Sequence, residues 1–536
     1  MPPANESVVK SYQNTLPSNS LVVVVVLLVL SGCATLPKDF ERSENFAIQD
    51  TADTKIARDL APLAAKYPEQ SGVYLLNKGM DAFAARMALI ETAEKSLDVQ
   101  YYIWHHDLTG KVILQRLLVA ANRGVRVRLL LDDLDTAGKD QILHTLDFHP
   151  SFEIRVFNPF ANRNARTLDF IGDLSRVNHR MHNKSLTADY LATIVGGRNI
   201  GDEYFDATPD VGFTDWDVIG VGQIAKEVSG AFDEYWNSEW VYPLSAFKPA
   251  QPITEESLTA FEKSAEEFIE EARNSAYNEA LKETSIARLS HVGELPFVWG
   301  RSVLVYDHPG KADTEEIKSD THLGPKLRKA FESSQQELIV VSPYFVPGDA
   351  IVEFFVNLVE RGVRVIILTN SLAANDVPLV HAGYMRYRDD LLRGGVELHE
   401  FKPTVIAGNR EKKNNKYIGS SRASLHAKAF AIDQRYMFVG SFNLDPRSIA
   451  LNTEMGVVFE APEYAAALSK GFDELGEVKT YRLALQKKSP DSEAEQLVWH
   501  SRKDGEKIVY TKEPETSWWN RFVAGFMSLF VPESQL

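Results

Sequence analysis

The sequence predicts an α/β protein made of two tandem copies of one domain, each a mixed β-sheet flanked by helices, with the functional site where the copies meet. Strand-like runs alternate with helical stretches in both halves of the chain. The pentapeptide RGVRV occurs at 123–127 and again at 361–365, and Phe157 and Pro159 correspond to Phe401 and Pro403. Such self-similarity indicates a duplication. Strand candidates are 97–103, 125–132, 153–157, 191–196 and 217–222, then 337–342, 363–369, 396–401, 428–432, 436–440 and 455–460.

Composition shifts divide the rest of the chain. A stretch rich in Glu, Ala and Lys separates the halves and is typical of a solvated helical connector. A hairpin is expected to turn at Asp504-Gly505, ahead of an aromatic tail. We expect a signal peptide with a lipobox at 1–33, a polar linker at 34–69, an N-terminal domain at 70–245, the connector at 246–296, a C-terminal domain at 297–480, and a hairpin with an amphipathic tail at 481–536.

Charge and cysteine content exclude several classes. The formal net charge of -16 over 536 residues argues against a nucleic-acid-binding protein, which usually shows a basic footprint. The single cysteine, Cys33, excludes both an intramolecular disulfide and a cysteine-rich zinc site. We expect neither a metal nor a cofactor.

Cys33 follows the apolar run 21–30 (LVVVVVLLVL), which is too short to span a bilayer. Together with the residues before it, Cys33 resembles a bacterial lipobox, which implies cleavage before Cys33 and lipid attachment to its sulfur. An ordinary signal peptide, or a buried helix that holds a cysteine, is the alternative. The first 20 residues depart from a signal sequence because they carry Glu6 and only one basic residue, Lys10.

The chemistry-bearing motif is also duplicated. An offset of 244 residues, the same as from Phe157 to Phe401, superposes one HxKxxxxD motif on the other. Two copies in register are not plausibly accidental. The first copy comprises His182, Lys184 and Asp189, and the second His426, Lys428 and Asp433. The same register superposes Gly197 and Asn199 on Ser441 and Asn443.

Residue spacing indicates what these motifs do. Residues two apart on an extended strand face the same side, so each histidine projects with its lysine. This pairing suits a phosphate anion, and the Gly-Gly or Gly-Ser turns at Gly197 and Ser441 are expected to bring backbone N–H groups and the amides of Asn199 and Asn443 to it. Two histidines suit a double displacement at phosphorus, with one imidazole as nucleophile and the other as general acid and base.

These motifs resemble the paired motifs of the phospholipase D superfamily. The resemblance implies that His182 is the nucleophile and His426 the acid/base, and near-symmetry leaves the reverse order open. It implies that Lys184, Lys428, Asn199 and Asn443 bind phosphate. Asp189 and Asp433 are expected to support the catalytic site without contacting substrate.

Many members of that superfamily orient each histidine with an acidic residue further along the chain. In the second half the resemblance implies that this residue is Glu454, which precedes a strand-like run. In the first half the fixed offset gives Asp210, whereas the strand pattern favours Asp217, which we prefer.

Longer segments resemble the C-type bacterial cardiolipin synthases: 96–104 (SLDVQYYIW), 180–185 (RMHNKS), 196–202 (GGRNIGD), 369–376 (TNSLAAND) and 440–448 (GSFNLDPRS). The resemblance runs from residue 70 to the C-terminus. It implies phosphatidyl transfer onto phosphatidylglycerol, with phosphatidylethanolamine as donor. The alternatives are an envelope phospholipase D or phosphodiesterase that uses water and, more weakly, a non-catalytic envelope scaffold.

The aromatic tail has helical spacing, with Trp518, Trp519, Phe522 and Phe526 on one face. Such a segment suits a membrane surface, and a terminal helix docked on the core is the alternative. We therefore expect phospholipid substrates, a membrane-associated lipoprotein of the bacterial cell envelope, and a site on its periplasmic face. The sequence identifies no accessory protein.

Overall fold

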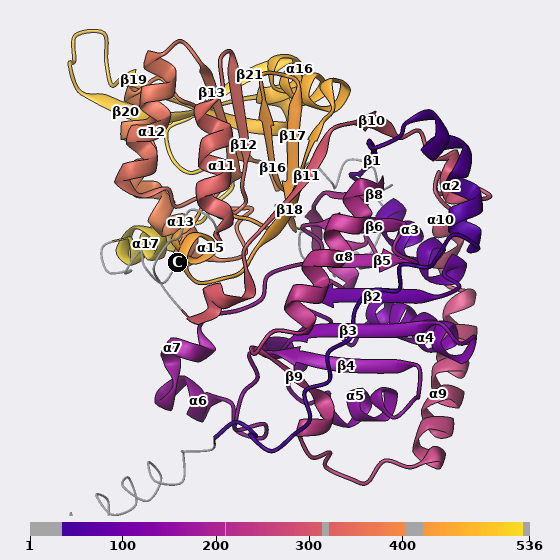
Figure 1. Cartoon of the computed structure of the whole chain (residues 1–536). Helices are drawn as coiled ribbons and strands as arrows, with labels where there is room; N and C mark the ends of the chain where they lie inside the picture. Colours follow the sequence, from indigo (N-terminus) through magenta and orange to yellow (C-terminus); the bar gives the residue numbers. More distant parts are fainter. Residues whose placement is uncertain (1–34, 209–210, 314–320, 404–421, 529–536) are drawn as a thin grey trace, which may run out of the picture.

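The computed structural model describes residues 35–208, 211–313, 321–403 and 422–528. The chain forms two α/β halves that lie side by side, the N-terminal half in indigo to magenta and the C-terminal half in orange to yellow (Figure 1). Each half is organised around one large mixed sheet. The predicted fold class, a duplicated α/β domain, is confirmed.

The first sheet has nine strands in the order β10-β1-β8-β6-β5-β2-β3-β4-β9. Its central strands are buried on both faces, as expected for a sheet covered by helices. In chain order the strands are β1 (Ser71–Leu76), β2 (Ser96–Tyr101), β3 (Arg126–Asp132), β4 (Phe152–Phe157), β5 (Ser185–Ala188), β6 (Ala192–Gly196), β8 (Asp217–Gly222), β9 (Val241–Pro243) and β10 (Val298–Gly300).

The second sheet has ten strands in the order β11-β18-β17-β16-β12-β13-β14-β19-β20-β21. A further pair, β7 (Val211–Thr214) and β15 (Arg422–Leu425), joins the two halves in parallel. The strands of the second sheet are β11 (Ser302–Tyr306), β12 (Glu337–Val341), β13 (Arg364–Asn370), β14 (Glu397–Phe401), β16 (Lys428–Ile432), β17 (Tyr436–Gly440), β18 (Met455–Glu460), β19 (Thr480–Lys487), β20 (Glu495–Lys503) and β21 (Glu506–Tyr510).

The six central strands of the two sheets match. The order β8-β6-β5-β2-β3-β4 in the first sheet corresponds to β18-β17-β16-β12-β13-β14 in the second. In both, three parallel strands adjoin three antiparallel ones. The sequence repeat is therefore a repeat of topology.

The recurring RGVRV pentapeptide is a helix stop followed by a strand start. Gly124 and Gly362 have φ values of 90° and 88°, a left-handed conformation that glycine adopts without a steric penalty. The next residues, Val125 and Val363, donate their N–H groups back to the last turn of the preceding helix. The chain can then turn directly into β3 or β13.

Helices cover both faces of each sheet. In the first half α3 and α4 pack against one face, and α8 lies against β11 of the second half. The helices are α2 (Lys55–Lys66), α3 (Gly79–Thr92), α4 (Leu108–Asn122), α5 (Asp140–Asp147), α6 (Thr167–Gly172), α7 (Leu174–Val177), α8 (Gln223–Trp236), α9 (Glu255–Arg273), α10 (Ala276–Lys282), α11 (Leu323–Glu332), α12 (Gly348–Glu360), α13 (Pro378–Tyr384), α14 (Arg388–Arg393), α15 (Pro446–Ala450), α16 (Pro462–Lys479) and α17 (Trp518–Met527).

Three segments differ from the expected domain boundaries. The stretch 34–69, expected as a linker, contains α2 and a strap that packs on the first half, where Asn45 bonds to Arg128. Strand β10 belongs to the first sheet although it lies beyond residue 297. The C-terminal hairpin extends the second sheet through β19. Strands β10 and β19 each pair with a strand, β1 or β14, whose backbone groups on that side need partners.

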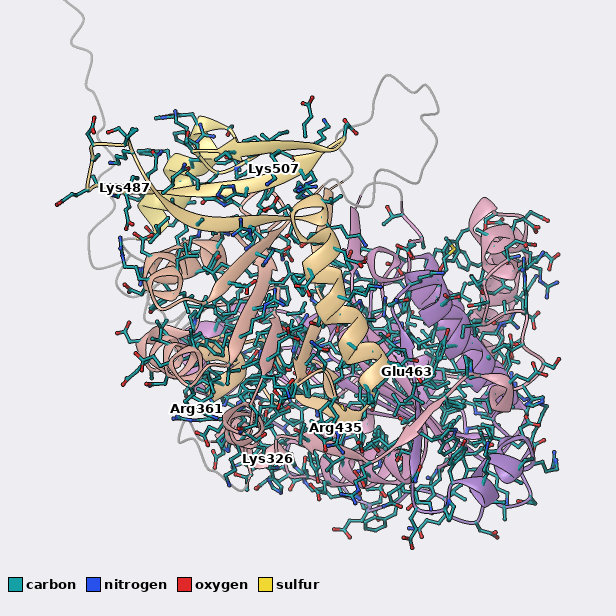
Figure 2. All side chains as sticks on the ribbon, turned by 90° about the horizontal axis from the view of Figure 1, so that it is seen from above. Lys326, Arg361, Arg435, Glu463, Lys487 and Lys507 are labelled. Carbon is teal, nitrogen blue, oxygen red and sulfur yellow. The ribbon has the colours of Figure 1, made fainter. Side chains whose placement is uncertain are left out.

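The halves share a hydrophobic interface. One core cluster combines residues of both sheets and of α8. Tyr464, at the start of α16, accepts a hydrogen bond from Leu75 N of the first half at 3.5 Å. Figure 2 shows Glu463 at this end of α16, beside the N-terminal half. Members of the cluster include Val73, Val195, Val218, Ile224, Leu304, Ile339, Val439 and Val457.

Candidate functional site

Each motif histidine is held by the backbone of the opposite half. His182 donates its N–H to Thr453 O at 2.8 Å. His426 follows β15, which pairs with β7, and donates its N–H to Thr214 O at 2.8 Å. The two halves thus exchange equivalent segments, and both histidines lie at their interface.

The carboxylates that contact the histidines also cross the interface. His182 Nδ1 lies 2.8 Å from Glu454 Oε2, and His426 Nδ1 lies 2.5 Å from Asp215 Oδ2. Both carboxylates are fully buried. Since Nδ1 faces the carboxylate in each case, Nε2 is the ring nitrogen available to a substrate, and that of His426 lies 3.0 Å from Lys428 Nζ. Glu454 therefore contacts the histidine of the opposite half.

Two further polar side chains fix the segments before the histidines. Asp132, at the end of β3, accepts the N–H of Met181 at 2.8 Å. Asn370, at the end of β13, accepts the N–H of Leu425 at 2.9 Å. The ends of the parallel strands therefore position both histidines.

The motif lysines lie beside their histidines, as the spacing predicts. Lys184 and Lys428 each donate from Nζ to the backbone oxygen of the histidine two residues earlier, at 2.6 Å. Lys428 Nζ also lies 3.0 Å from the imidazole of His426. Both ammonium groups are buried, and burial lowers the pKa of Lys184 well below its usual range. An anion at this place would restore favourable solvation of the charges.

Burial shifts the titration of the whole cluster. It lowers the pKa of His182 well below its ordinary value, with further lowering by Lys184, and it lowers the pKa of His426. Burial raises the pKa of Glu454 to about 7. Burial alone would raise the pKa of Asp215, but contact with His426 outweighs it and the pKa is lowered. The two histidine–carboxylate pairs are therefore electrostatically unequal.

The two asparagines differ as well. Asn199 donates from Nδ2 to the Tyr204 hydroxyl at 3.0 Å and accepts from Ile103 N at 3.3 Å. Asn443 is buried, and its Oδ1 has no hydrogen-bond partner among the described residues. A buried amide oxygen without a partner is costly and marks a place for a ligand donor.

The expected role of Gly197 and Ser441 is wrong. Their backbone N–H groups are donated to the carbonyls of Trp216 and Met455, at 3.0 and 2.8 Å, and so are not free for phosphate. The Ser441 hydroxyl instead donates to Glu454 Oε2 at 2.5 Å. A Cβ on Gly197 would lie 2.2 Å from Asp215 Oδ1. Gly197 therefore leaves room for the carboxylate of Asp215, and Ser441 donates a hydrogen bond to that of Glu454.

Asp217 does not orient a histidine, and that prediction is wrong. Its carboxylate lies 2.9 Å from Arg86 and 3.3 Å from Arg198, both fully buried. Asp215, two residues earlier, takes the expected role. The alternative, Asp210, lies outside the described residues.

The motif aspartates support the fold and do not contact the histidines. Asp189 accepts three backbone N–H groups from residues 94–96, at the turn into β2. Asp433 accepts the equivalent groups from 335–337, at the turn into β12. Both aspartates have positive φ values, 50° and 52°. Their grouping with the catalytic residues is corrected to a structural role.

A signal for Asp215 was present in the sequence. Strand register makes Asp217 the counterpart of Gly456, an offset of 239 residues and not 244. The Thr-Asp pair at 214–215 then corresponds to the Thr-Glu pair at 453–454. The two copies have loops of different length after the asparagines, which hid this match.

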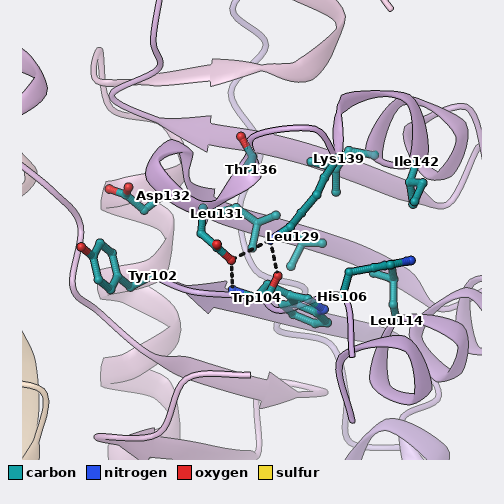
Figure 3. Close-up of a pocket in the computed structure, with 12 residues that line it drawn as sticks. Tyr102, Trp104, His106, Leu114, Leu129, Leu131, Asp132, Thr136, Lys139 and Ile142 are labelled. Atoms are coloured by element: carbon teal, nitrogen blue, oxygen red, sulfur yellow. Dashed lines mark hydrogen bonds and ion pairs between the residues drawn. The ribbon is translucent and has the colours of Figure 1, made fainter. Parts of the chain in front are cut away.

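Behind the His182 side of the site lies a mostly apolar pocket. Figure 3 shows Tyr102 and Asp132 at one side of it, with Trp104 at its centre. The Tyr102 ring lies 4.9 Å from that of His182, edge to face. Asp135 accepts from Trp104 N at 2.9 Å and pairs with Lys139 at 2.7 Å. Tyr102 therefore both lines this pocket and contacts His182.

Outside the interface, the described residues bring together one group with metal-ligand chemistry, His105, Asp107 and Glu203. His105 pairs with Glu203 at 3.1 Å, and Asp107 caps α4 by accepting from Gly110 N at 3.0 Å. The ion pair and the helix cap explain why these three side chains lie together.

Cys33 and the predicted signal peptide lie outside the described residues. Among helices within the described ranges, none is both long and apolar enough to cross a membrane.

Paired histidines, each with a buried lysine, at the interface of a duplicated α/β fold define the phospholipase D superfamily. Residues 87–236 and 327–475 match the family described as "Cardiolipin synthase, PLD-like domain". The chain belongs to this family.

Relatives of known name agree with this assignment. Cardiolipin synthase C of Escherichia coli (strain K12) is 41% identical over 89% of this chain and 99% of its own length. Cardiolipin synthase A of Pseudomonas entomophila (strain L48) is 26% identical over 76% of this chain and 69% of its own. The crystal structure of phosphatidylserine synthase from Haemophilus influenzae Rd KW20 has a TM-score of 0.53 at 16% identity, over 80% of this chain and 92% of that one. This last likeness concerns the fold alone.

Proposed function

We propose that the protein is a phosphatidyltransferase that forms cardiolipin from phosphatidylglycerol and a phospholipid donor, phosphatidylethanolamine, through a phosphohistidine. The crossed histidine–carboxylate pairs carry this proposal, since they leave two Nε2 atoms for one phosphodiester. The name of the 41% identical relative, cardiolipin synthase C, supports the product.

In the first step His182 is the nucleophile. Its Nε2 forms a bond to phosphorus, and the bond from phosphorus to the head-group oxygen breaks. His426 Nε2 gives a proton to the leaving alkoxide. In the second step His426 takes the proton of an acceptor hydroxyl, whose oxygen displaces His182 from phosphorus.

The unequal pairs favour this order. A nucleophile must be neutral, and burial lowers the pKa of His182 well below its ordinary value beside a Glu454 whose pKa is raised to about 7. Burial lowers the pKa of His426 too, but the carboxylate of Asp215, whose own pKa is lowered, remains ionised and opposes that lowering. The acid is therefore assigned to His426.

Lys184 and Lys428 neutralise the negative charge of the phosphate. The amides of Asn199 and Asn443 donate further hydrogen bonds to it. The free Oδ1 of Asn443 suits a hydroxyl donor from substrate. Preorganised donors in a buried site stabilise developing charge without reorganisation.

We further infer that the protein is a lipoprotein of the bacterial cell envelope, anchored through Cys33, with the site on the periplasmic face. Helix α17 supports a membrane surface as partner. It contacts α13 (Figure 1). Its Ala524 is buried, whereas four of its aromatic side chains are exposed. These are Trp518, Trp519, Phe522 and Phe526, between 49% and 66% exposed.

The position of α17 fits delivery of lipid. It contacts α13, which begins two residues after Asp376, and Asp376 accepts a hydrogen bond from Tyr344 beside His426. Vesicles of phosphatidylethanolamine and phosphatidylglycerol test this face with the four aromatics changed to serine in a Cys33→Ser background. Vesicle binding should fall while turnover in detergent persists, and unchanged binding would contradict the assignment.

The function is tested by incubating the protein with phosphatidylethanolamine and phosphatidylglycerol and identifying all products. Cardiolipin with released ethanolamine is expected. Phosphatidic acid without cardiolipin would show that water is the acceptor and would overturn the proposal.

A further inference from the structure

The two histidines have different numbers of aromatic neighbours. We call the side chains around each histidine its wall. His182 has one ring neighbour, Tyr102, among the described residues. His426 has three: Tyr204 at 5.3 Å, Phe213 at 5.1 Å and Tyr344 at 6.2 Å between ring centroids. An aromatic wall of this kind suits a cation, and the Lys428 ammonium already lies 5.9 Å from the centroid of the Tyr344 ring.

The two walls also differ in charge. The exposed carboxylate of Asp376 accepts a hydrogen bond from the Tyr344 hydroxyl at 2.7 Å. It lies close enough to raise the pKa of His426, against the dominant lowering by burial. On the other side, the charges that act on Tyr102 are the carboxylate of Asp132 and, after it, the guanidinium groups of Arg447 and Arg180. The carboxylate of the His182 wall is buried and ion-paired with Arg180 at 3.1 Å, whereas the carboxylate of the His426 wall, Asp376, is exposed.

We propose that Asp376, with the rings of Tyr204, Phe213 and Tyr344, forms a subsite for a primary ammonium on the leaving head group. This inference rests on the proposed function, since it concerns the donor at the same site. The alcohol that leaves must take its proton from His426, so its other end lies along the His426 wall. A two-carbon amino alcohol is short enough to contact both.

The contact with Asp376 does not change which bonds form and break in the first step. The phosphorus–oxygen bond of the donor breaks, His426 supplies the proton, and the amino alcohol leaves with its ammonium still charged. Asp376 pairs with that charge and takes no proton. Asp376 is thus a specificity residue.

The experiment measures donor choice with one acceptor. Mixed vesicles of phosphatidylethanolamine and phosphatidylglycerol are supplied, and released ethanolamine and glycerol are quantified together. Asp376→Asn should lower the ethanolamine-to-glycerol ratio about fivefold, the effect of one partly exposed charge pair. Asp376→Glu should retain most of the preference. Asp349→Asn, an exposed aspartate at the start of α12, is the matched control and should leave the ratio unchanged.

The outcomes separate the two proposals. Absence of ethanolamine release by the unmodified protein would overturn the donor assigned above, and the subsite with it. Release of ethanolamine with an unchanged ratio in Asp376→Asn would overturn the subsite alone. Total release in Asp376→Asn shows whether the variant is folded and active.

Discussion

The two halves of this protein place equivalent histidines at one interface, yet they give them different surroundings. His182 pairs with a glutamate whose pKa is raised to about 7, whereas His426 pairs with an aspartate whose pKa is lowered. Duplication supplies two like groups, and divergence of their neighbours separates the nucleophile that we propose, His182, from the acid that we propose, His426. The difference teaches that roles in a near-symmetric site are set by the residues that contact the motif.

The largest expected effect comes from removing either histidine. His182→Ala and His426→Ala should each lower kcat at least about a thousandfold, because each step of the double displacement needs both imidazoles. Cardiolipin formation by the purified variants measures this. Substantial activity in either one would break the comparison between the halves.

Asp215 and Asp217 separate catalysis from stability. Asp215→Asn should lower kcat about a hundredfold, because His426 loses its ionised partner, and of the two variants it should lose less stability. Asp217→Asn should instead cost about 3–5 kcal/mol of stability, because two buried arginines lose their partner. Thermal unfolding and steady-state rates of both variants test this, and the reverse pattern would restore Asp217 as the orienting residue.

The pH dependence tests the buried lysine. Burial lowers the pKa of Lys428 to about 8, so it loses its proton as pH rises through that value. We expect kcat/KM to fall there, since the cation binds phosphate. The folded pKa is below the unfolded value of 10.5, so stability contributed by this group should rise with pH between about 8 and 10.5. A Lys428→Met variant should show a smaller rise in thermal midpoint than the unmodified protein, because Lys184, whose pKa is also lowered, still contributes; an unchanged rise would contradict the assignment.

The smallest effect is expected at Ser441, whose hydroxyl helps to hold Glu454. Ser441→Ala should lower kcat about threefold to tenfold, since one hydrogen bond to the carboxylate is lost while the one to His182 remains. Ser469→Ala is the matched control, because its buried hydroxyl donates to Glu337 at 3.0 Å. An equal loss of kcat in both variants would mean that the effect is not specific to the site.

Much of the fold followed from local pattern. The alternation of strands and helices and the RGVRV repeat predicted a duplicated sheet, because helix stops and buried strands are encoded locally. Strands β10 and β19 could not be placed, since their pairing with β1 and β14 depends on the folded neighbour.

The site was predicted as a set of motifs but not as a set of contacts. The spacing placed each lysine beside its histidine, as observed. It could not show that Glu454 and Asp215 reach across the interface, because nothing local specifies how two halves dock. The roles expected of Gly197 and Asp217 failed for a related reason: glycine there makes room for Asp215, and Asp217 neutralises buried arginines.

The central claim is that His182 carries the phosphatidyl group. Rapid mixing of the protein with labelled phosphatidylethanolamine in the absence of phosphatidylglycerol, followed by an alkaline quench and peptide mapping, tests it directly. The label is predicted on the peptide that contains His182 and not on the one that contains His426. Label on His426, or turnover with no labelled histidine, would contradict it.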